Sequence, residues 1–321
     1  DPVTLIRRPM VLQDKMLAGP SSQTKASAVA LVDAARRLAG SKVDGTVVLA
    51  WTVLESLNRK GLEAVVQLHG PFSEAYLFSR NFGFTRDGRE LAPADLPEPG
   101  AGVLAANPLA EGIAGTVKAL HAEPRPGSTT GGPDWKGAQV GYLGLPSRYQ
   151  DSPVELVHIE DVETLSNTVV RIAGGDVEAT AAVPVLPPLP QVVEVGQGYE
   201  PAVGLIESLV AEYGVSGAEE PVRKTIRSLL PEWAEPEEDD TGDLWVTFGE
   251  GEDHIVFVAH MDEVGFLVES VLDDGRLELR TRGGAAANLW EAQAALVHTG
   301  SGDISAVFEP RPNAFSAKER R

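Results

Sequence analysis

The sequence predicts an α/β fold in which a mixed sheet is flanked by helices and interrupted by a small β-rich domain. Two short apolar runs, 44–53 and 253–261, have the β-branched composition of strands that are buried on both faces of a sheet. Other segments have helical periodicity, whereas the last part of the chain carries short strands and turns. With 321 residues, of which 43% are hydrophobic, the chain can bury a large core.

The first predicted helix covers residues 25–40, "KASAVALVDAARRLAG". Its apolar residues recur with helical period, and Gly40 provides a stop signal. The run "DGTVVLAWTV" at 44–53 follows and predicts a buried strand. A second buried strand is predicted for "DHIVFVAHM" at 253–261.

Two further helices are predicted between these strands. In "EPAVGLIESLVAEYG" (200–214), one face carries Leu205, Leu209 and Val210, and Gly214 ends the helix. In "AEEPVRKTIRSLL" (218–230), one face carries Val222, Ile226 and Leu229. We expect both helices to pack on the core.

A proline-rich segment separates the helical regions. The run "VPVLPPLP" at 183–190 contains a Pro-Pro pair, which excludes a helix and favours an extended chain. We therefore expect a linker at 183–199. The remainder divides into an α/β domain of residues 20–182 and 200–268 and a β-rich domain of residues 269–321 and 1–19, where turns such as "DDGR" and "GSGD" occur.

Charge and composition exclude several classes of partner. The formal charge of −20, from 47 acidic and 27 basic side chains, repels phosphate backbones and anionic lipids, so neither nucleic acid nor a membrane is expected. No cysteine occurs, which removes disulfides and thiolate metal sites and fits a reducing compartment. Without an apolar run of membrane-spanning length or a signal peptide at its start, we expect the protein in the cytoplasm.

The segment "HIVFVAHMDEVGFLV" at 254–268 carries a candidate site. His260 and Asp262 stand two residues apart where a buried strand ends, so the carboxylate of Asp262 can orient the imidazole of His260 or a metal bound to it. An isolated H-x-D pair is more often a hydrogen-bonded surface pair.

Longer stretches place this pair in a family context. The segments "LIESLVAEYGVSGAEEPVRKTIRSLL", "VAHMDEVGFLV", "TVVLAWTVLESLNRKG" and "VGYLGLPSRYQDSPVELVHIEDVETL" together resemble the deblocking and glutamyl aminopeptidases, two-metal peptidases that form large tetrahedral assemblies. The resemblance implies a zinc-peptidase-like fold, a peptide substrate and a homo-oligomer. The order of segments differs, because the family's closing segments come first here. The resemblance therefore implies either a circular permutant joined through the linker or two pieces numbered around an unseen loop.

Position by position, the resemblance carries over some functional residues and not others. It assigns His260 as the first metal ligand, Asp262 as its orienting carboxylate and Glu55 as the general base. The bridging aspartate corresponds to Gln23, with Thr24 as the neighbouring alternative. Three further ligand positions correspond to Ser56, Phe78 and Asp151, and among these only Asp151 is an oxygen ligand.

A two-metal peptidase needs an anion between its cations, which repel each other strongly. No carboxylate stands at Gln23, so we expect no metal or a weakly bound one, with zinc or cobalt as the ion if the protein is active. His260, Asp151 and Glu55, joined by His69 after local rearrangement, could form one weak site. The other histidines have no ligand spacing.

The sequence thus predicts a metallo-aminopeptidase-like protein with a degenerate metal site, impaired or inactive, that keeps a scaffold, peptide-binding or assembly role. The first alternative is an active aminopeptidase in which His260 and Asp151 hold metal and Glu55 acts as the base. The second is a structural subunit of an oligomer. Peptides or other copies of the chain are the expected partners.

Overall fold

The computed structural model describes residues 1–5, 10–12, 15–39, 41–43, 45–55, 59–78, 82–84, 99–100, 102–106, 120–121, 123–124, 133–149, 154–174, 200–284 and 287–310. The helices are α1 (Ser22–Arg37), α2 (Lys60–His69), α4 (Ile159–Ile172), α5 (Glu200–Ala211), α6 (Glu220–Leu229) and the short 3-10 helix η3 (Ala287–Leu289).

The strands of the first half are β1 (Pro2–Leu5), β2 (Met10–Val11), β3 (Met16–Gly19), β4 (Thr46–Thr52), β5 (Glu74–Phe78), β6 (Phe82–Phe84), β7 (Leu104–Ala106), β8 (Leu120–His121), β9 (Glu123–Pro124), β10 (Gln139–Gly144), β11 (Ser147–Arg148) and β12 (Glu155–His158). Those of the second half are β13 (Glu237–Glu238), β14 (Leu244–Phe248), β15 (His254–His260), β16 (Gly265–Val271), β17 (Leu277–Arg282), β18 (Ala294–Thr299) and β19 (Gly302–Val307).

The centre of the molecule is an eight-stranded mixed sheet with the order β13-β14-β4-β15-β5-β10-β7-β8. Strands β4, β15, β5 and β10 run parallel to one another, whereas β14 and β7 pair with them in the antiparallel direction. The two apolar runs predicted as buried strands are therefore direct neighbours, β4 and β15, although about 200 residues separate them. The predicted mixed α/β class is confirmed.

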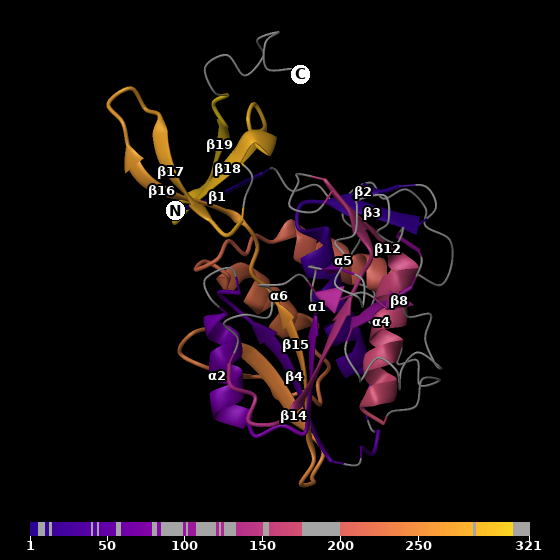
Figure 1. The fold of residues 1–321 in the computed structure, drawn as a ribbon. Helices are drawn as coiled ribbons and strands as arrows, with labels where there is room; N and C mark the ends of the chain where they lie inside the picture. The colour runs from indigo at the N-terminus through magenta and orange to yellow at the C-terminus, as the bar shows by residue number, and fades with distance from the viewer. Residues whose placement is uncertain are drawn as a thin grey trace.

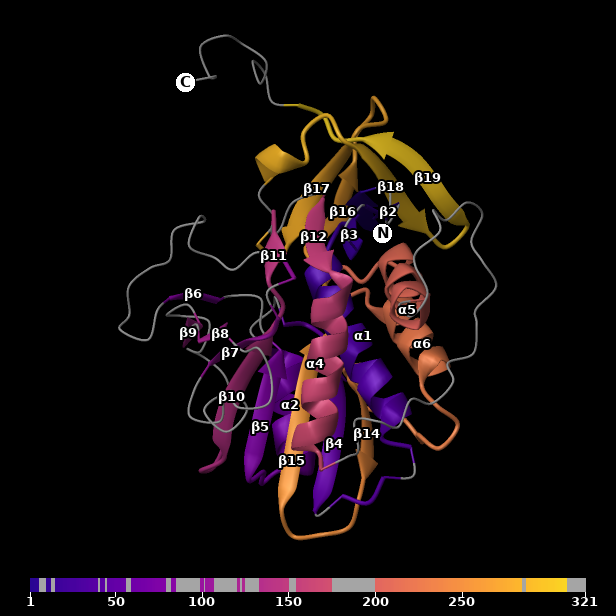
Figure 2. The same ribbon diagram turned by 90° about the vertical axis from the view of Figure 1, so that its right-hand side faces the viewer.

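Helices cover both faces of this sheet. Helices α1, α4 and α5 pack against one another on one face, where α1 contacts both of the others, and Figure 2 shows α4 and α1 in front of the sheet. Alternate residues of β4 point to this face and belong to its apolar core, namely Val47, Leu49 and Trp51. The intervening residues Val48 and Ala50 pack with α2 on the opposite face. This alternation follows from the two-residue period of a strand.

The observed helices agree with the predicted ones to within a few residues. Helix α1 begins three residues before the predicted helix at 25–40, because Ser22, Gln23 and Thr24 already have helical backbone. Helices α5 and α6 fall within 200–214 and 218–230. Within the described residues, no helix is long and apolar enough to span a membrane.

A separate five-stranded sheet has the order β17-β16-β1-β18-β19. It lies above the α/β body in Figure 1, with the N-terminal strand β1 between β16 and β18. Strand β1 thus shares a sheet with strands between residues 265 and 307, whereas the division into domains stays a prediction. Strand β3 pairs instead with β12 in a four-stranded sheet, β11-β12-β3-β2. The expected linker at 183–199 and the chain end at 311–321 lie outside the described residues.

Candidate functional site

The sequence-predicted pair His260 and Asp262 lies at the carboxyl edge of the central sheet. His260 ends β15 and is paired in register with Thr52, which ends the parallel neighbour β4. The Met261 amide donates to the Thr52 carbonyl at 2.8 Å. Because parallel strands end at the same edge of a sheet, this pairing brings residues 53–55 beside residues 260–262. This edge is where open α/β sheets bind their ligands.

The imidazole of His260 is held from one side. Its Nδ1 lies 3.0 Å from the carbonyl oxygen of Asp262 and 3.3 Å from Asp262 Oδ1. Both neighbours are oxygen acceptors, so Nδ1 is the nitrogen that donates to them, and Nε2 is the nitrogen left to contact a ligand. Asp262 therefore contacts the imidazole through both its backbone carbonyl and its side chain, and its orienting role stays a prediction.

Asp262 also joins two other segments to this site. Its Oδ1 accepts the Glu55 amide at 2.9 Å, and its Oδ2 is hydrogen-bonded to the Ser216 hydroxyl. The side chain is 0% exposed. A buried carboxylate requires several such donors, because removing it from water is otherwise strongly unfavourable. Asp262 thus fixes the backbone that carries Glu55, and Ser216 is a contributor that no sequence pattern indicated.

Glu55 is engaged in an ion pair. Its Oε1 lies 2.9 Å from Nε of Arg59, and the two side chains are 28% and 18% exposed. An arginine guanidinium donates hydrogen bonds to a carboxylate in a fixed planar geometry, so Arg59 occupies this oxygen of Glu55. The sequence assigned Glu55 as a general base, and the structure adds a guanidinium that competes for the same oxygen.

The turn that carries Glu55 is held by carboxylates from three separate segments. The Val53 amide donates to Asp243 Oδ1 at 2.7 Å, and the Leu54 amide donates to Glu219 Oε1 at 3.3 Å. Burial raises the pKa of Glu219, and burial raises the pKa of Asp243 to about 7. Sequence reasoning missed both residues, because a single acidic residue at a helix start or before a strand is usually exposed.

Gln23 occupies the position predicted for the bridging carboxylate and is built into the protein core. Its amide nitrogen Nε2 donates to the Leu145 carbonyl at 2.8 Å, and its backbone N–H donates to Glu155 Oε2 at 3.1 Å. The remaining side-chain oxygen, Oε1, is buried and has no hydrogen-bond partner among the described residues. A neutral amide anchored in this way does not supply the anion that two adjacent cations require.

Phe78 belongs to the core as well. It ends β5, is paired in register with Leu143 of β10, and is 6% exposed within the apolar cluster below α1. Its aromatic ring supplies no donor to a metal. The other two predicted positions, Ser56 and Asp151, lie outside the described residues.

The described residues therefore do not fit a two-metal site. Among them, no group of three or more histidine, aspartate and glutamate side chains is arranged to hold a metal ion. His260 offers Nε2, but Gln23 and Phe78 offer no charge, and Glu55 is paired with Arg59.

The remaining described histidines have other surroundings. His69 stacks edge-on against Trp245 with ring centroids 4.6 Å apart, and burial lowers its pKa. His158 caps the start of α4 by accepting the Glu160 amide at 3.2 Å. His298 lies between the Thr4 hydroxyl and Asp303, each at 2.8 Å. These contacts agree with the structural roles expected for histidines without ligand spacing.

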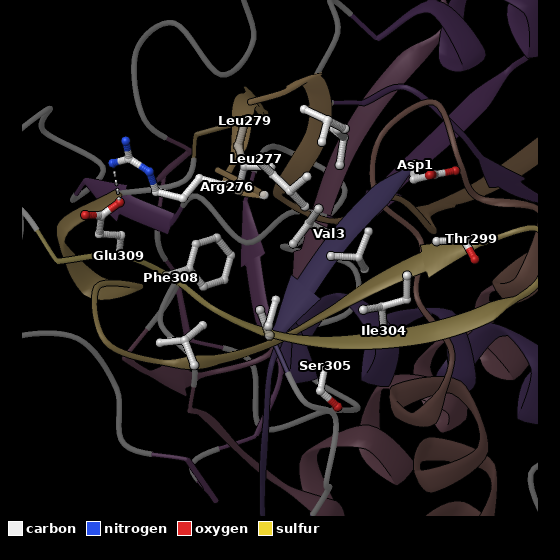
Figure 3. A pocket seen from close by; sticks show the side chains of 17 residues that line it. Asp1, Val3, Arg276, Leu277, Leu279, Thr299, Ile304, Ser305, Phe308 and Glu309 are labelled. Carbon is white, nitrogen blue, oxygen red and sulfur yellow. Dashed lines mark hydrogen bonds and ion pairs between the residues drawn. The ribbon is translucent and has the colours of Figure 1, made fainter. Parts of the chain in front are cut away.

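A cavity of about 600 Å³ lies elsewhere, on one face of the five-stranded sheet. Figure 3 shows apolar side chains such as Val3, Leu277, Leu279 and Ile304 along it, and Arg276 paired with Glu309 at its margin. None of the residues at the His260 edge lines this cavity. Its lining residues do not combine a nucleophile with a base or a set of metal ligands. We therefore take the edge of the central sheet at His260 as the candidate functional site.

A family of known proteins matches the part of the chain that contains His260. Residues 242–321 match the M42 glutamyl aminopeptidase family. The predicted resemblance is thereby confirmed over this segment, which contains His260 and Asp262. Glu55, Gln23 and Phe78 lie outside it, so their correspondence to the aminopeptidases rests on the sequence resemblance and the geometry above.

A curated relative supports the same segment. The glutamyl aminopeptidase of Lactococcus lactis subsp. cremoris (strain MG1363) is 36% identical over 83 residues, which are 25% of this chain and 23% of the relative. The match therefore spans about a quarter of the length of that aminopeptidase.

Solved structures show partial similarity. The dodecameric structure of PhTET1-12s is 35% identical over 34% of each chain, with a TM-score of 0.32. A TET aminopeptidase from a marine sediment Thaumarchaeota archaeon is 16% identical over 52% of each chain, with a TM-score of 0.40. An aminopeptidase from the archaeon Desulfurococcus kamchatkensis is 15% identical over 56% of each chain, with a TM-score of 0.38.

Proposed function

We propose that this protein is a metallo-aminopeptidase-like protein with a degenerate metal site, catalytically impaired or inactive, that retains the scaffold and binds peptides or serves in assembly. One observation carries the proposal: Gln23, at the position of the bridging carboxylate, is a neutral buried amide tied to the Leu145 carbonyl. Two divalent cations a few ångströms apart repel each other strongly without an intervening anion.

Two further contacts support the loss of hydrolysis. Phe78 places an aromatic ring at another ligand position, and Arg59 is ion-paired with Oε1 of Glu55, the residue that would receive a proton from water. What remains is a histidine with a free Nε2 beside a carboxylate and an arginine. Such groups can bind the charged and polar ends of a peptide without cleaving it.

The alternative is an active aminopeptidase with an altered metal site. The orientation of His260 by Asp262 favours this reading, because it leaves Nε2 ready to bind a cation. In that case Asp151 would be the second ligand, zinc or cobalt the ion, and Glu55 the base. A third candidate is a structural subunit of a homo-oligomer.

Several expectations from the sequence remain part of this proposal. We place the protein in the cytoplasm, with peptides or other copies of itself as partners, and we interpret the order of its segments as a circular permutation or as two pieces numbered around an unseen loop. The pairing of β1 with β16 and β18 agrees with both interpretations, because it closes the β-rich sheet with the first residues of the chain.

The decisive experiment counts metal ions per chain. Purified protein is equilibrated with zinc or cobalt, free ion is removed, and bound metal is measured by elemental analysis with a His260→Ala variant alongside. The expected result is no metal, or less than one loosely held ion. Two ions per wild-type chain, lost in the variant, would restore the active aminopeptidase.

Hydrolysis and binding are measured on the same preparations. Aminoacyl chromogenic substrates should not be cleaved, whereas unmodified peptides should bind and protect the protein against thermal unfolding. Metal-dependent cleavage would overturn the proposal in favour of the first alternative. A large monodisperse particle that binds no peptide would favour the structural subunit.

A further inference from the structure

Three consecutive backbone amides at the end of β4 each donate to a different buried carboxylate. Val53 donates to Asp243 at 2.7 Å, Leu54 to Glu219 at 3.3 Å and Glu55 to Asp262 at 2.9 Å. Successive amides in a turn form a concavity that attracts negative charge. Here the anions are side chains of the protein, from the segment before α6, the segment before β14 and the segment after β15.

The three carboxylates are more deeply buried than acidic residues usually are. Asp243 and Asp262 are 0% exposed and Glu219 is 6% exposed. The carboxylates repel one another. The negative charges of Asp262 and Glu219 both raise the pKa of Asp243, and that of Asp262 raises the pKa of Glu219. A cluster of this kind persists only when its hydrogen bonds to the turn offset the loss of hydration.

The backbone conformation of Leu54 explains why the amides of residues 53–55 need three carboxylate acceptors. Leu54 has a φ of 56°, in the left-handed region that disfavours a residue with a branched side chain. Residues in this region persist when the surrounding structure over-determines them, and they concentrate at functional sites. The Leu54 amide is the middle one of the three that the carboxylates hold.

Two of the acceptors are themselves fixed in place. Asp243 follows a tight turn in which Asp239 Oδ1 accepts the amides of residues 241, 242 and 243 at 2.8–2.9 Å. Glu219 Oε1 also accepts the Gly217 amide at 2.8 Å. Gly61 allows α2 to approach, because a Cβ at this position would lie 2.2 Å from Asp243 Oδ1. Asp243 and Glu219 are therefore held in place by contacts other than those with residues 53–55.

We propose that Glu219 and Asp243 are positioning residues for Glu55, which act through the backbone of residues 53–55 to set the Glu55–Arg59 pair beside His260. The connection to His260 runs through Asp262 Oδ1, which accepts the Glu55 amide and lies against His260 Nδ1. The functional meaning of this role rests on the proposed peptide binding at the sheet edge. The positioning itself is measured independently of any ligand.

The test uses the full chain with Glu219→Gln and Asp243→Asn, and Asp161→Asn as a matched control. Asp161 is likewise buried and accepts two backbone amides, Gly100 at 2.6 Å and Gly102 at 2.8 Å, from a different segment of the chain. Backbone amide hydrogen exchange is followed by NMR at residues 46–55, together with the Glu55 carboxyl ¹³C shift, which reports its pairing with Arg59.

We expect exchange at residues 53–55 to accelerate by roughly ten- to a hundredfold in both variants, because a charged acceptor is replaced by a neutral amide oxygen that accepts a weaker hydrogen bond. The Glu55 ¹³C shift should move, while exchange at 46–52 and all signals in the control should stay as in the wild type. An unchanged Glu55 shift despite faster exchange would overturn the positioning role. Equally faster amide exchange along all of β4 would show that Glu219 and Asp243 have a purely structural role.

A second variant covers the case in which these substitutions prevent folding. Glu219→Asp keeps the charge and shortens the side chain by one methylene, so the carboxylate no longer reaches the Leu54 amide. This variant should remain folded and show the same faster exchange at residues 53–55 and the same change in the Glu55 ¹³C shift. A wild-type pattern would contradict the proposal.

Peptide affinity, measured by calorimetry, should fall at least about tenfold in the same variants and not in Asp161→Asn. If the wild type binds no peptide while exchange and shift behave as expected, the proposed function fails and the positioning role stands.

Discussion

Asp262 and Glu55 are joined by a single hydrogen bond, from the Glu55 amide to Asp262 Oδ1 at 2.9 Å, that connects two strand ends far apart in sequence. The same oxygen lies 3.3 Å from His260 Nδ1. One buried carboxylate therefore sets the position of an imidazole and of a glutamate-bearing turn together. This explains why the three sequence-predicted residues at this edge lie together.

Replacing Asp262 by asparagine should destabilise the protein by about 1–3 kcal/mol, because the amide cannot accept from both the Glu55 amide and the Ser216 hydroxyl as the carboxylate does. Urea unfolding at neutral pH measures the loss. Asp274→Asn is the control, since Asp274 is exposed and contacts Arg276 through an ion pair and the Arg276 amide, so that the change in stability should be less than about 0.5 kcal/mol. Equal effects of the two substitutions would contradict the assignment.

Gln23→Asp should also destabilise the protein, by about 2–4 kcal/mol in the presence of a chelator. The substitution removes the donor to the Leu145 carbonyl and buries a charge in the core. Thermal and urea unfolding measure the change, with Gln139→Asp at an exposed strand position as the control. A neutral or stabilising effect would show that the pocket around residue 23 still accommodates a carboxylate.

Glu163 should make stability depend on pH. Burial, followed by the charges of Asp33 and Glu160, raises its pKa from 4.5 to about 7. Its protonated form is favoured in the folded state, so its contribution is complete below pH 4.5 and is lost as pH rises through 7. Glu163→Gln should therefore be more stable than the wild type above pH 7, by on the order of 1–3 kcal/mol, and nearly equal to it below pH 4.5.

Urea midpoints between pH 4 and 8 test this prediction for Glu163. Asp243 contributes in the same direction in both proteins, so the difference between wild type and variant isolates Glu163. Glu269→Gln, at an exposed position, should run parallel to the wild type throughout. A Glu163→Gln curve that is also parallel would show that the side chain titrates as it does in water.

Gly61→Ala should cost about 1–3 kcal/mol, because its Cβ would meet Asp243 Oδ1 at 2.2 Å and the Val53 carbonyl at 2.6 Å. Gly204→Ala is the matched control in helix α5, where a Cβ would have nothing within 4 Å. It should stabilise the protein by about 0.4–1 kcal/mol through the unfolded chain. Unfolding free energies of the two variants should therefore change in opposite directions, and an equal change would contradict the close contact at Gly61.

Much of the fold could be predicted because its signals are local. The buried strands β4 and β15 were recognisable from continuous β-branched runs, and α5 and α6 from apolar residues at helical spacing. The start of α1 was not recognised, because the polar residues Ser22, Gln23 and Thr24 are buried by tertiary contacts that no local pattern records.

By itself, the sequence determined the mixed α/β class, the strand that ends in His260 and the absence of a carboxylate at residue 23, since these depend on residue type and short-range periodicity. Only the tertiary structure decided that Arg59 pairs with Glu55 and that Glu219, Asp243 and Asp262 converge on three consecutive amides. The physical reason is that sheet pairing brings together chain segments up to about two hundred residues apart. Burial then gives each isolated acidic residue a hydrogen-bonding role that its neighbours in sequence do not indicate.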